Sequence, residues 1–318
     1  MRIHKFTNSI LQSLNAPAPI ALFVYNRPDH TLETLTHLKK NDLAAESELF
    51  IFSDGPRGPK DEAGVNEVRI IARQVTGFKT VKVIERENNM GLARSIISGV
   101  TELVDTYGRV IVFEDDLVSS PYTLQYFNDA LEHYKDVEKV MHISSYIFPL
   151  GDVDLPETFF FRAAFSWGWA TWARAWKNFE PDIDKLIARF DDEKIKQFSI
   201  EGTMNFWKQM QDFKAGKNNS WAIRWYASVF LNGGLTLNPS RSLVHNIGHD
   251  GSGTHSNIEN MYGTQVAQSP VTYFPDVLEE DKKAYEAIKY FLSNRKGSVL
   301  QRISRRVNQL KVKYFSRK

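Results

Sequence analysis

The first third of the chain alternates apolar runs with amphipathic segments, and this alternation limits its fold more than any other feature. Four runs are typical of strands and cover residues 20–26, 49–55, 80–86 and 109–116. The segments between them, residues 27–40, 61–76 and 91–108, are typical of helices. Strands that alternate with helices form a mostly parallel sheet flanked by helices. We therefore expect an α/β fold.

Polar residues follow all four predicted strands. They are Asn26-Arg27, Asp54, Asn88-Asn89 and the three acids Glu114, Asp115 and Asp116. In parallel α/β sheets, ligands bind outside the carboxyl ends of the strands. We therefore expect these side chains to line one cleft.

The three acids come directly after Val110–Phe113, an apolar run typical of a strand buried on both faces. Like charges crowded at the mouth of a buried strand repel one another and lose hydration. A hard divalent cation, Mg²⁺ or Mn²⁺, would offset both costs, and it would hold a diphosphate at the same place. The acids therefore predict a metal site.

The amino-acid composition excludes several kinds of site and favours one cellular location. The chain has 318 residues, of which 42% are hydrophobic and none is cysteine, which excludes disulfides, thiolate zinc sites and thiol nucleophiles. It shows neither a signal peptide nor a run near the ~20 apolar residues that span a bilayer. We expect a cytoplasmic protein.

The C-terminal segment, residues 291–318, is expected to form a basic amphipathic helix. From Asn294 onward it has nine basic residues and no acid, whereas the rest of the chain has 31 basic and 38 acidic residues. Such a helix suits the anionic inner face of the cell membrane, at ~1 kcal/mol per basic residue. One alternative is a helix packed on the domain with its basic face in solvent. The acidic remainder argues against nucleic acid as a partner.

The second half of the chain does not continue the alternation of strands and helices, but it contains no segment typical of a linker between domains. Four tryptophans lie within ten residues, a charged stretch that predicts helices runs to Lys217, and a glycine-rich run covers Asn246–His255. We expect one domain over residues 1–290, with a nucleotide-binding half at about 17–150 and an acceptor half at about 151–290.

Five segments together resemble a known family. They are "FVYNRPDHTLETL", "FSDGPRG", "NNMGLARSI", "VIVFEDDLVSSPYTLQYF" and "SWGWATWARAW". Over residues 17–255 the chain is similar to nucleotide-sugar glycosyltransferases of the GT-A (Rossmann-like) fold, of the bacterial surface-polysaccharide type. More distantly it is similar to the N-acetylglucosaminyltransferase that begins complex N-glycans. The resemblance implies a UDP-sugar donor such as UDP-GlcNAc, Mn²⁺ or Mg²⁺ as cofactor, and a lipid-linked or surface-glycan acceptor.

The resemblance also implies roles for the residues of the first loops. The acids match the DXD motif of the family, so Asp116 would bind the metal, Asp115 would face the ribose and Glu114 would support the site. Arg27 would contact the nucleotide or its diphosphate. Asp54 would accept a hydrogen bond from the uracil N–H, unless it is only a turn acid before a glycine.

Further residues around the donor are implied in the same way. Asn89 and Arg94 would touch the nucleotide and the donor, although Arg94 is equally typical of a solvated helix. Trp167 and Trp169 would border the pocket for the donor sugar and the acceptor. The spacing of Trp169, Trp172 and Trp176 is equally typical of one face of a core helix, and we expect Trp172 and Trp176 to lie in the core.

The general base departs from the pattern of the family. Inverting transfer needs a base for the acceptor hydroxyl, and related sequences place an aspartate just after a tryptophan, but no acid follows Trp221 here. Asp250 is the replacement candidate, with a turn acid as the alternative. His255, like His249, would complete the metal shell or touch phosphate, with a structural histidine as the alternative.

These features predict a metal-dependent, inverting glycosyltransferase of polysaccharide or lipopolysaccharide biosynthesis. One alternative is a related protein that binds a nucleotide sugar without catalysis, which the missing acid after Trp221 favours. Another is a sugar-phosphate nucleotidyltransferase. Such enzymes open with a glycine-rich loop and a lysine after the first strand, where this chain has "YNRPDH".

Overall fold

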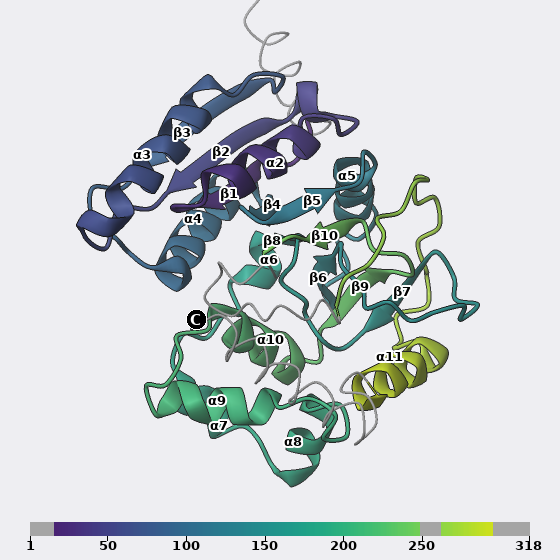
Figure 1. The fold of residues 1–318 in the computed structure, drawn as a ribbon. Coiled ribbons are helices and arrows are strands. Elements are labelled where there is room, and N and C mark those ends of the chain that lie inside the picture. Colours follow the sequence, from purple (N-terminus) through teal and green to yellow (C-terminus); the bar gives the residue numbers. More distant parts are fainter. Residues whose placement is uncertain (1–15, 249–261, 295–318) are drawn as a thin grey trace, which may run out of the picture.

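The computed structural model describes residues 16–248 and 262–294 (Figure 1). The predicted positions Asp250 and His255 lie outside the described residues. The basic segment after Asn294 also lies outside them, so the C-terminal helix stays a prediction.

The alternation predicted for the first third of the chain is confirmed. The strands are β1 (Ile20–Val24), β2 (Glu48–Ser53), β3 (Thr80–Glu85) and β4 (Arg109–Glu114), and the helices are α2 (Pro28–Leu38), α3 (Pro59–Gln74) and α4 (Leu92–Tyr107). A proline begins both α2 and α3, since its fixed φ suits the first helical position. Gly108 ends α4 with a φ of 75°, the left-handed conformation in which glycine is favoured.

These four strands are parallel neighbours in the order β3-β2-β1-β4. Phe23 on β1 pairs with Glu114 on β4, and Val24 pairs with Ser53 on β2, so the strands end almost level with one another. Apolar residues of α4 pack on one face of the sheet, and those of α2 and α3 pack on the other. The loops that follow the four strands therefore meet at one edge.

The part of the chain after β4 extends the same sheet. Its strands are β5 (Leu117–Ser119), β6 (Val140–Ser144), β7 (Thr158–Phe161), β8 (Trp169–Trp172), β9 (Leu235–Pro239) and β10 (Val244–Asn246). The large sheet continues from β4 through β8, β6, β9 and β7; β8 is antiparallel to both of its neighbours, and β7 is antiparallel to β9. The fold is thus α/β, with parallel pairing in the first half and mixed pairing in the second. Strands β5 and β10 form a separate antiparallel pair.

A short 3-10 helix, η1 (Ala44–Glu46), lies between α2 and β2. The helices that follow β4 are α5 (Thr123–His133), α6 (Ala173–Trp176), α7 (Ile183–Ile187), α8 (Asp192–Phe198), α9 (Phe206–Lys214), α10 (Trp221–Leu231) and α11 (Lys282–Asn294). The helices predicted for the charged stretch up to Lys217 are confirmed. Figure 1 shows α10 between the sheet and the group formed by α7, α8 and α9. Among the described residues, no helix combines the length and apolar character needed to cross a bilayer.

The tryptophan-rich segment does not form the core helix of which its spacing is equally typical. Trp169 and Trp172 lie on β8, and α6 begins only at Ala173. Both faces of this central strand are buried, so a tryptophan fits on either side of it. Trp172 and Trp176 lie in the core with 4% and 5% of their surface exposed, as expected.

Candidate active site

Asp54 ties together the loops that follow β2 and β3. Its buried carboxylate accepts the backbone N–H groups of Gly55 at 3.0 Å, Met90 at 2.8 Å and Gly91 at 2.9 Å. The Asn89 side-chain amide donates to the Gly55 carbonyl at 2.7 Å. Asp54 therefore orients the start of α4. Oδ1 accepts two of these bonds and Oδ2 accepts one, so Oδ2 can accept a further hydrogen bond, and the contact with uracil stays a prediction.

Gly55 explains how closely these two loops approach each other. A Cβ atom at this position would lie 2.6 Å from the carbonyl carbon of Asn88. Only a residue without a side chain allows the contact, which places Asn89 beside Asp54.

Arg27 brings the loop after β1 to the acids after β4. Its Nη2 atom donates to Asp115 Oδ1 in a short contact and to Asp116 Oδ2 at 3.0 Å. The backbone N–H of Tyr25 donates to the other oxygen of Asp115 at 3.4 Å. The structure thus joins the predicted residues Arg27, Asp115 and Asp116 in one cluster.

Residues at the end of β10 also contact this cluster. The Asn246 side-chain amide donates to Asp116 Oδ1 at 3.3 Å, and the Ile247 N–H donates to the Asp116 carbonyl at 2.9 Å. Gly248 follows so closely that a Cβ atom there would lie 2.3 Å from Asp116 Oδ2. Asn246 and Gly248 are not among the residues predicted from the glycine-rich run, which were His249, Asp250 and His255. The only sequence feature that could have indicated Asn246 and Gly248 is the glycine-rich run, because both residues lie near its start.

Burial and crowding set the charge state of the acids. Burial, reinforced by repulsion from Asp116 and Asp115, raises the pKa of Glu114 to about 8. Burial also raises the pKa of Asp115 to about 6, although Arg27 opposes the shift. Burial lowers the pKa of Arg27, but Asp115 and Asp116 more than offset this effect and raise it above its ordinary value. The cluster thus resists a full negative charge unless a further cation joins it.

The oxygens of this cluster fit a hard divalent cation. Within residues 16–248 and 262–294, no three His, Cys, Asp or Glu side chains form a ligand cage. Mg²⁺ and similar ions do not need such a cage, because they commonly use one or two carboxylates together with substrate phosphates. Asp116, with Asp115 beside it, offers such a partial ligand set. Arg27 now contacts the same oxygens.

The two tryptophans expected at the pocket, Trp167 and Trp169, have different environments in the structure. Trp167 is partly exposed and packs edge-on against Tyr146, with ring centroids 4.4 Å apart. Trp169 is fully buried and stacks between His142 and Trp221 at 5.2 Å from each. Trp169 therefore lies in the core, where its side chain has no surface to offer a sugar. Arg94 is exposed on the first turn of α4.

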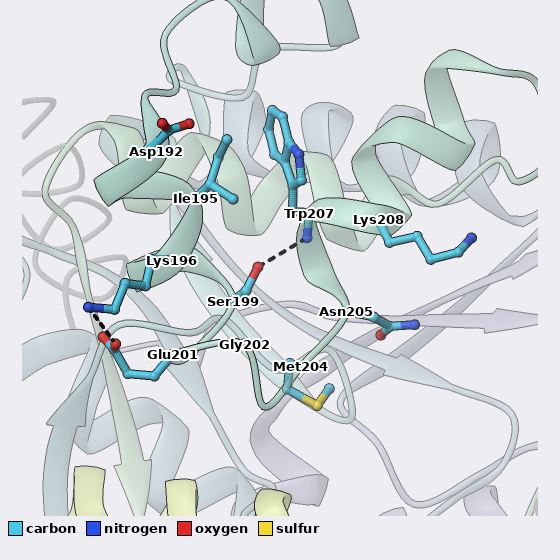
Figure 2. Close-up of a pocket in the computed structure, with 10 residues that line it drawn as sticks. All are labelled: Asp192, Ile195, Lys196, Ser199, Glu201, Gly202, Met204, Asn205, Trp207 and Lys208. Carbon is cyan, nitrogen blue, oxygen red and sulfur yellow. Dashed lines mark hydrogen bonds and ion pairs between the residues drawn. The ribbon is translucent and has the colours of Figure 1, made fainter.

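A separate hollow of about 390 Å³ lies between α8 and α9, in the group of helices that α10 separates from the sheet (Figures 1 and 2). The charged side chains at its rim are largely paired, since Lys196 contacts Glu201 at 3.2 Å and Lys208 contacts Asp212. Its lining contains none of the predicted site residues; it consists of Asp192, Ile195, Lys196, Ser199, Glu201, Gly202, Met204, Asn205, Trp207 and Lys208. The hollow and the acidic cluster are therefore different sites.

Comparisons with known proteins gave matches only among solved structures. No protein-family model matches the sequence, and no curated protein matches it. The crystal structure of S. aureus TarS matches with 17% identity and a TM-score of 0.31, over 44% of this chain and 24% of that chain. This chain thus spans about a quarter of the TarS chain. The mannosyltransferase PcManGT from Pyrobaculum calidifontis, in complex with GDP-Man and Mn2+, matches with 13% identity and a TM-score of 0.35, over 69% of this chain and 74% of that chain.

Proposed function

We propose that the protein is a metal-dependent glycosyltransferase that moves a sugar, with inversion, from a UDP-sugar to a lipid-linked or surface-glycan acceptor. The proposal rests on the polar contacts at the carboxyl ends of the four parallel strands. Arg27, after β1, contacts Asp115 and Asp116, after β4. Asp54, after β2, accepts the N–H of Met90, and Asn89 donates to the Gly55 carbonyl, so the loops after β2 and β3 are joined as well. This is where parallel α/β sheets bind nucleotides.

Each residue of the cluster has a role in the proposal. Asp116 holds the cation, which neutralises the charge that develops on the leaving diphosphate. Asp115 faces the ribose, and Glu114 supports the site. Arg27 binds the diphosphate, which the proposal places beside the cation, since its guanidinium contacts the carboxylates that would hold that cation.

The remaining roles concern the base, the donor and the acceptor. Asp54 accepts from the uracil N–H, and Asn89 and Arg94 contact the donor. Trp167 offers its partly exposed ring to the C–H face of a sugar. Asp250 takes the proton of the acceptor hydroxyl, and His255 touches phosphate or the cation.

A donor panel tests the function. The protein is incubated with UDP-, GDP- and dTDP-sugars in the presence of Mn²⁺, with and without EDTA, and the release of nucleoside diphosphate is measured. We expect release from one UDP-sugar, its loss with EDTA, and its loss in Asp116→Ala. Pyrophosphate chemistry would instead indicate a nucleotidyltransferase. Tight binding without turnover would indicate a non-catalytic protein, and full activity of Asp116→Ala would refute the metal assignment.

The basic segment after Asn294 is proposed to hold the protein at the inner face of the cell membrane, beside a lipid-linked acceptor. Vesicles that contain about a third anionic lipid should sediment the full chain but not a variant truncated after Asn294. Equal sedimentation of both proteins would refute the anchor and leave the proposed transfer reaction untouched.

A further inference from the structure

We propose that Asn246 and Gly248 are positioning residues for Asp116, which leave its Oδ2 atom as the single oxygen that binds the cation. The inference rests on the proposed function. It adds to the proposed metal site two residues, Asn246 and Gly248, that lie more than a hundred residues from the acids in sequence. It follows from three features of the residues that surround the Asp116 carboxylate.

The first feature is the fixed orientation of the Asn246 side chain, which is 8% exposed. Its Oδ1 atom accepts the N–H of Gly248 at 2.8 Å, and this bond decides which way the amide points. The Nδ2 atom must then face Asp116, and it donates to Oδ1 of that carboxylate at 3.3 Å. One of the two Asp116 oxygens is therefore held by the protein itself.

The second feature is that backbone pairing holds this segment beside Asp116. Asn246 on β10 pairs with Leu117 on β5, the residue that follows Asp116. The Ile247 N–H donates to the carbonyl of Asp116 itself at 2.9 Å. Because these bonds join backbone atoms, the main chain of Asn246 cannot move away from Asp116 without breaking the strand pair.

The third feature is the lack of a side chain at Gly248. A Cβ atom there would lie 2.3 Å from Asp116 Oδ2, 3.0 Å from its Cγ atom and 3.1 Å from Nη1 of Arg27. Any other residue would push the carboxylate or the guanidinium out of place. The requirement for glycine is therefore steric, and it applies at the oxygen that Asn246 leaves free.

Together these contacts give the two oxygens of Asp116 different tasks. Oδ1 is tied to Asn246, whereas Oδ2 faces the side where Arg27 now donates to it at 3.0 Å. A cation that binds Asp116 through one oxygen would meet Oδ2 at an angle set by Asn246 and Gly248. Such partners of a metal ligand typically contribute about 10–100-fold in metal affinity.

The test measures Mn²⁺ affinity in the presence of saturating UDP, by electron paramagnetic resonance of the free ion, for Gly248→Ala and Asn246→Ala. The matched control is Gly58→Ala, since a Cβ atom there would have nothing within 4 Å and the backbone φ of 179° suits any residue. We expect Mn²⁺ binding at least tenfold weaker in both variants and within twofold of the unaltered protein in the control. Circular dichroism melting of each variant without metal shows that the fold is kept.

Unchanged Mn²⁺ affinity in folded Gly248→Ala and Asn246→Ala would overturn the inference while the proposed transfer reaction stands. If the unaltered protein bound no Mn²⁺, with or without UDP, the inference and the metal requirement would both be wrong. The donor panel without metal would then decide separately whether the protein is a glycosyltransferase.

Discussion

The Nη2 atom of Arg27 lies 3.0 Å from Oδ2 of Asp116, and the same atom also donates to Asp115. The side chains of both aspartates are largely buried, with 7% and 17% of their surface exposed. One guanidinium thus balances two carboxylates at the mouth of β4. In the proposed function a divalent cation would use the same oxygens, so Arg27 and the cation would compete for the acids.

We predict that Arg27→Gln binds Mn²⁺ alone more tightly than the unaltered protein, by roughly tenfold, because the acids lose their resident positive charge. The same variant should bind UDP more weakly, because the diphosphate loses a charged donor. Isothermal titration of Mn²⁺ and of UDP in separate experiments measures both effects. Arg73→Gln is the control, since Arg73 makes its ion pair with Glu85 on the exterior. Weaker Mn²⁺ binding by Arg27→Gln would show that Arg27 does not compete with the cation.

Asp54→Ala should destabilise the fold, because three backbone N–H groups lose a charged acceptor at once. Hydrogen bonds to a charged group are worth about 1.5–3 kcal/mol each, and water replaces part of them. We expect the free energy of unfolding to fall by about 2–4 kcal/mol, as measured by urea denaturation. The exposed Asp105→Ala on α4 should change it by less than about 0.5 kcal/mol. A similar loss in both variants would contradict the bracing role of Asp54.

The position of the acidic cluster could be predicted because it depends on local patterns. Apolar runs, proline at two helix starts and Gly108 at a helix end define β1–β4 and the helices between them. Parallel connection then brings the strand ends together whatever the detailed packing is. Arg27 therefore meets Asp116, and Asp54 meets the loop after β3, at the edge of the sheet that the pattern indicated.

The positions of Asn246 and Trp169 could not be predicted in this way, since both depend on long-range pairing. Asn246 reaches Asp116 only because β10 pairs with β5, and two short strands far apart in the chain carry no local sign of that pairing. Trp169 lies on a strand inserted between β4 and β6, where a spacing of three residues is as compatible with a strand as with a helix. In each case the tertiary neighbours decide the role of the residue.

The two tryptophans of β8 allow the effect of one buried hydrogen bond on the free energy of unfolding to be measured. Trp172 Nε1 donates to the Leu131 carbonyl at 3.0 Å, whereas Trp169 Nε1 is buried without a partner among the described residues. Phenylalanine removes a similar volume at either site, but only at Trp172 does it also remove a hydrogen bond. Trp172→Phe should therefore cost about 1–2 kcal/mol more than Trp169→Phe. Equal losses in urea denaturation would indicate that the indole of Trp169 has a partner.

The same core makes stability depend on pH through His142. The ring is fully buried, accepts from Trp225 Nε1 at 3.0 Å and contacts the Phe165 carbonyl at 2.9 Å. Burial lowers its pKa to about 3, whereas an unfolded histidine titrates near 6.5. Between these values the unfolded chain binds the extra proton, so this contribution to stability is complete above about pH 6.5 and is lost as the pH falls toward 3.

We therefore expect the free energy of unfolding to fall with acidification by up to roughly 1.4 kcal/mol per pH unit on account of His142. Urea denaturation between pH 4 and 7 measures the slope for the unaltered protein and for His142→Gln. The glutamine variant should be less stable at pH 7 but should show a shallower slope, because its side chain does not titrate. Parallel slopes would contradict the prediction, because other titrating groups contribute equally to both proteins and only His142 differs between them.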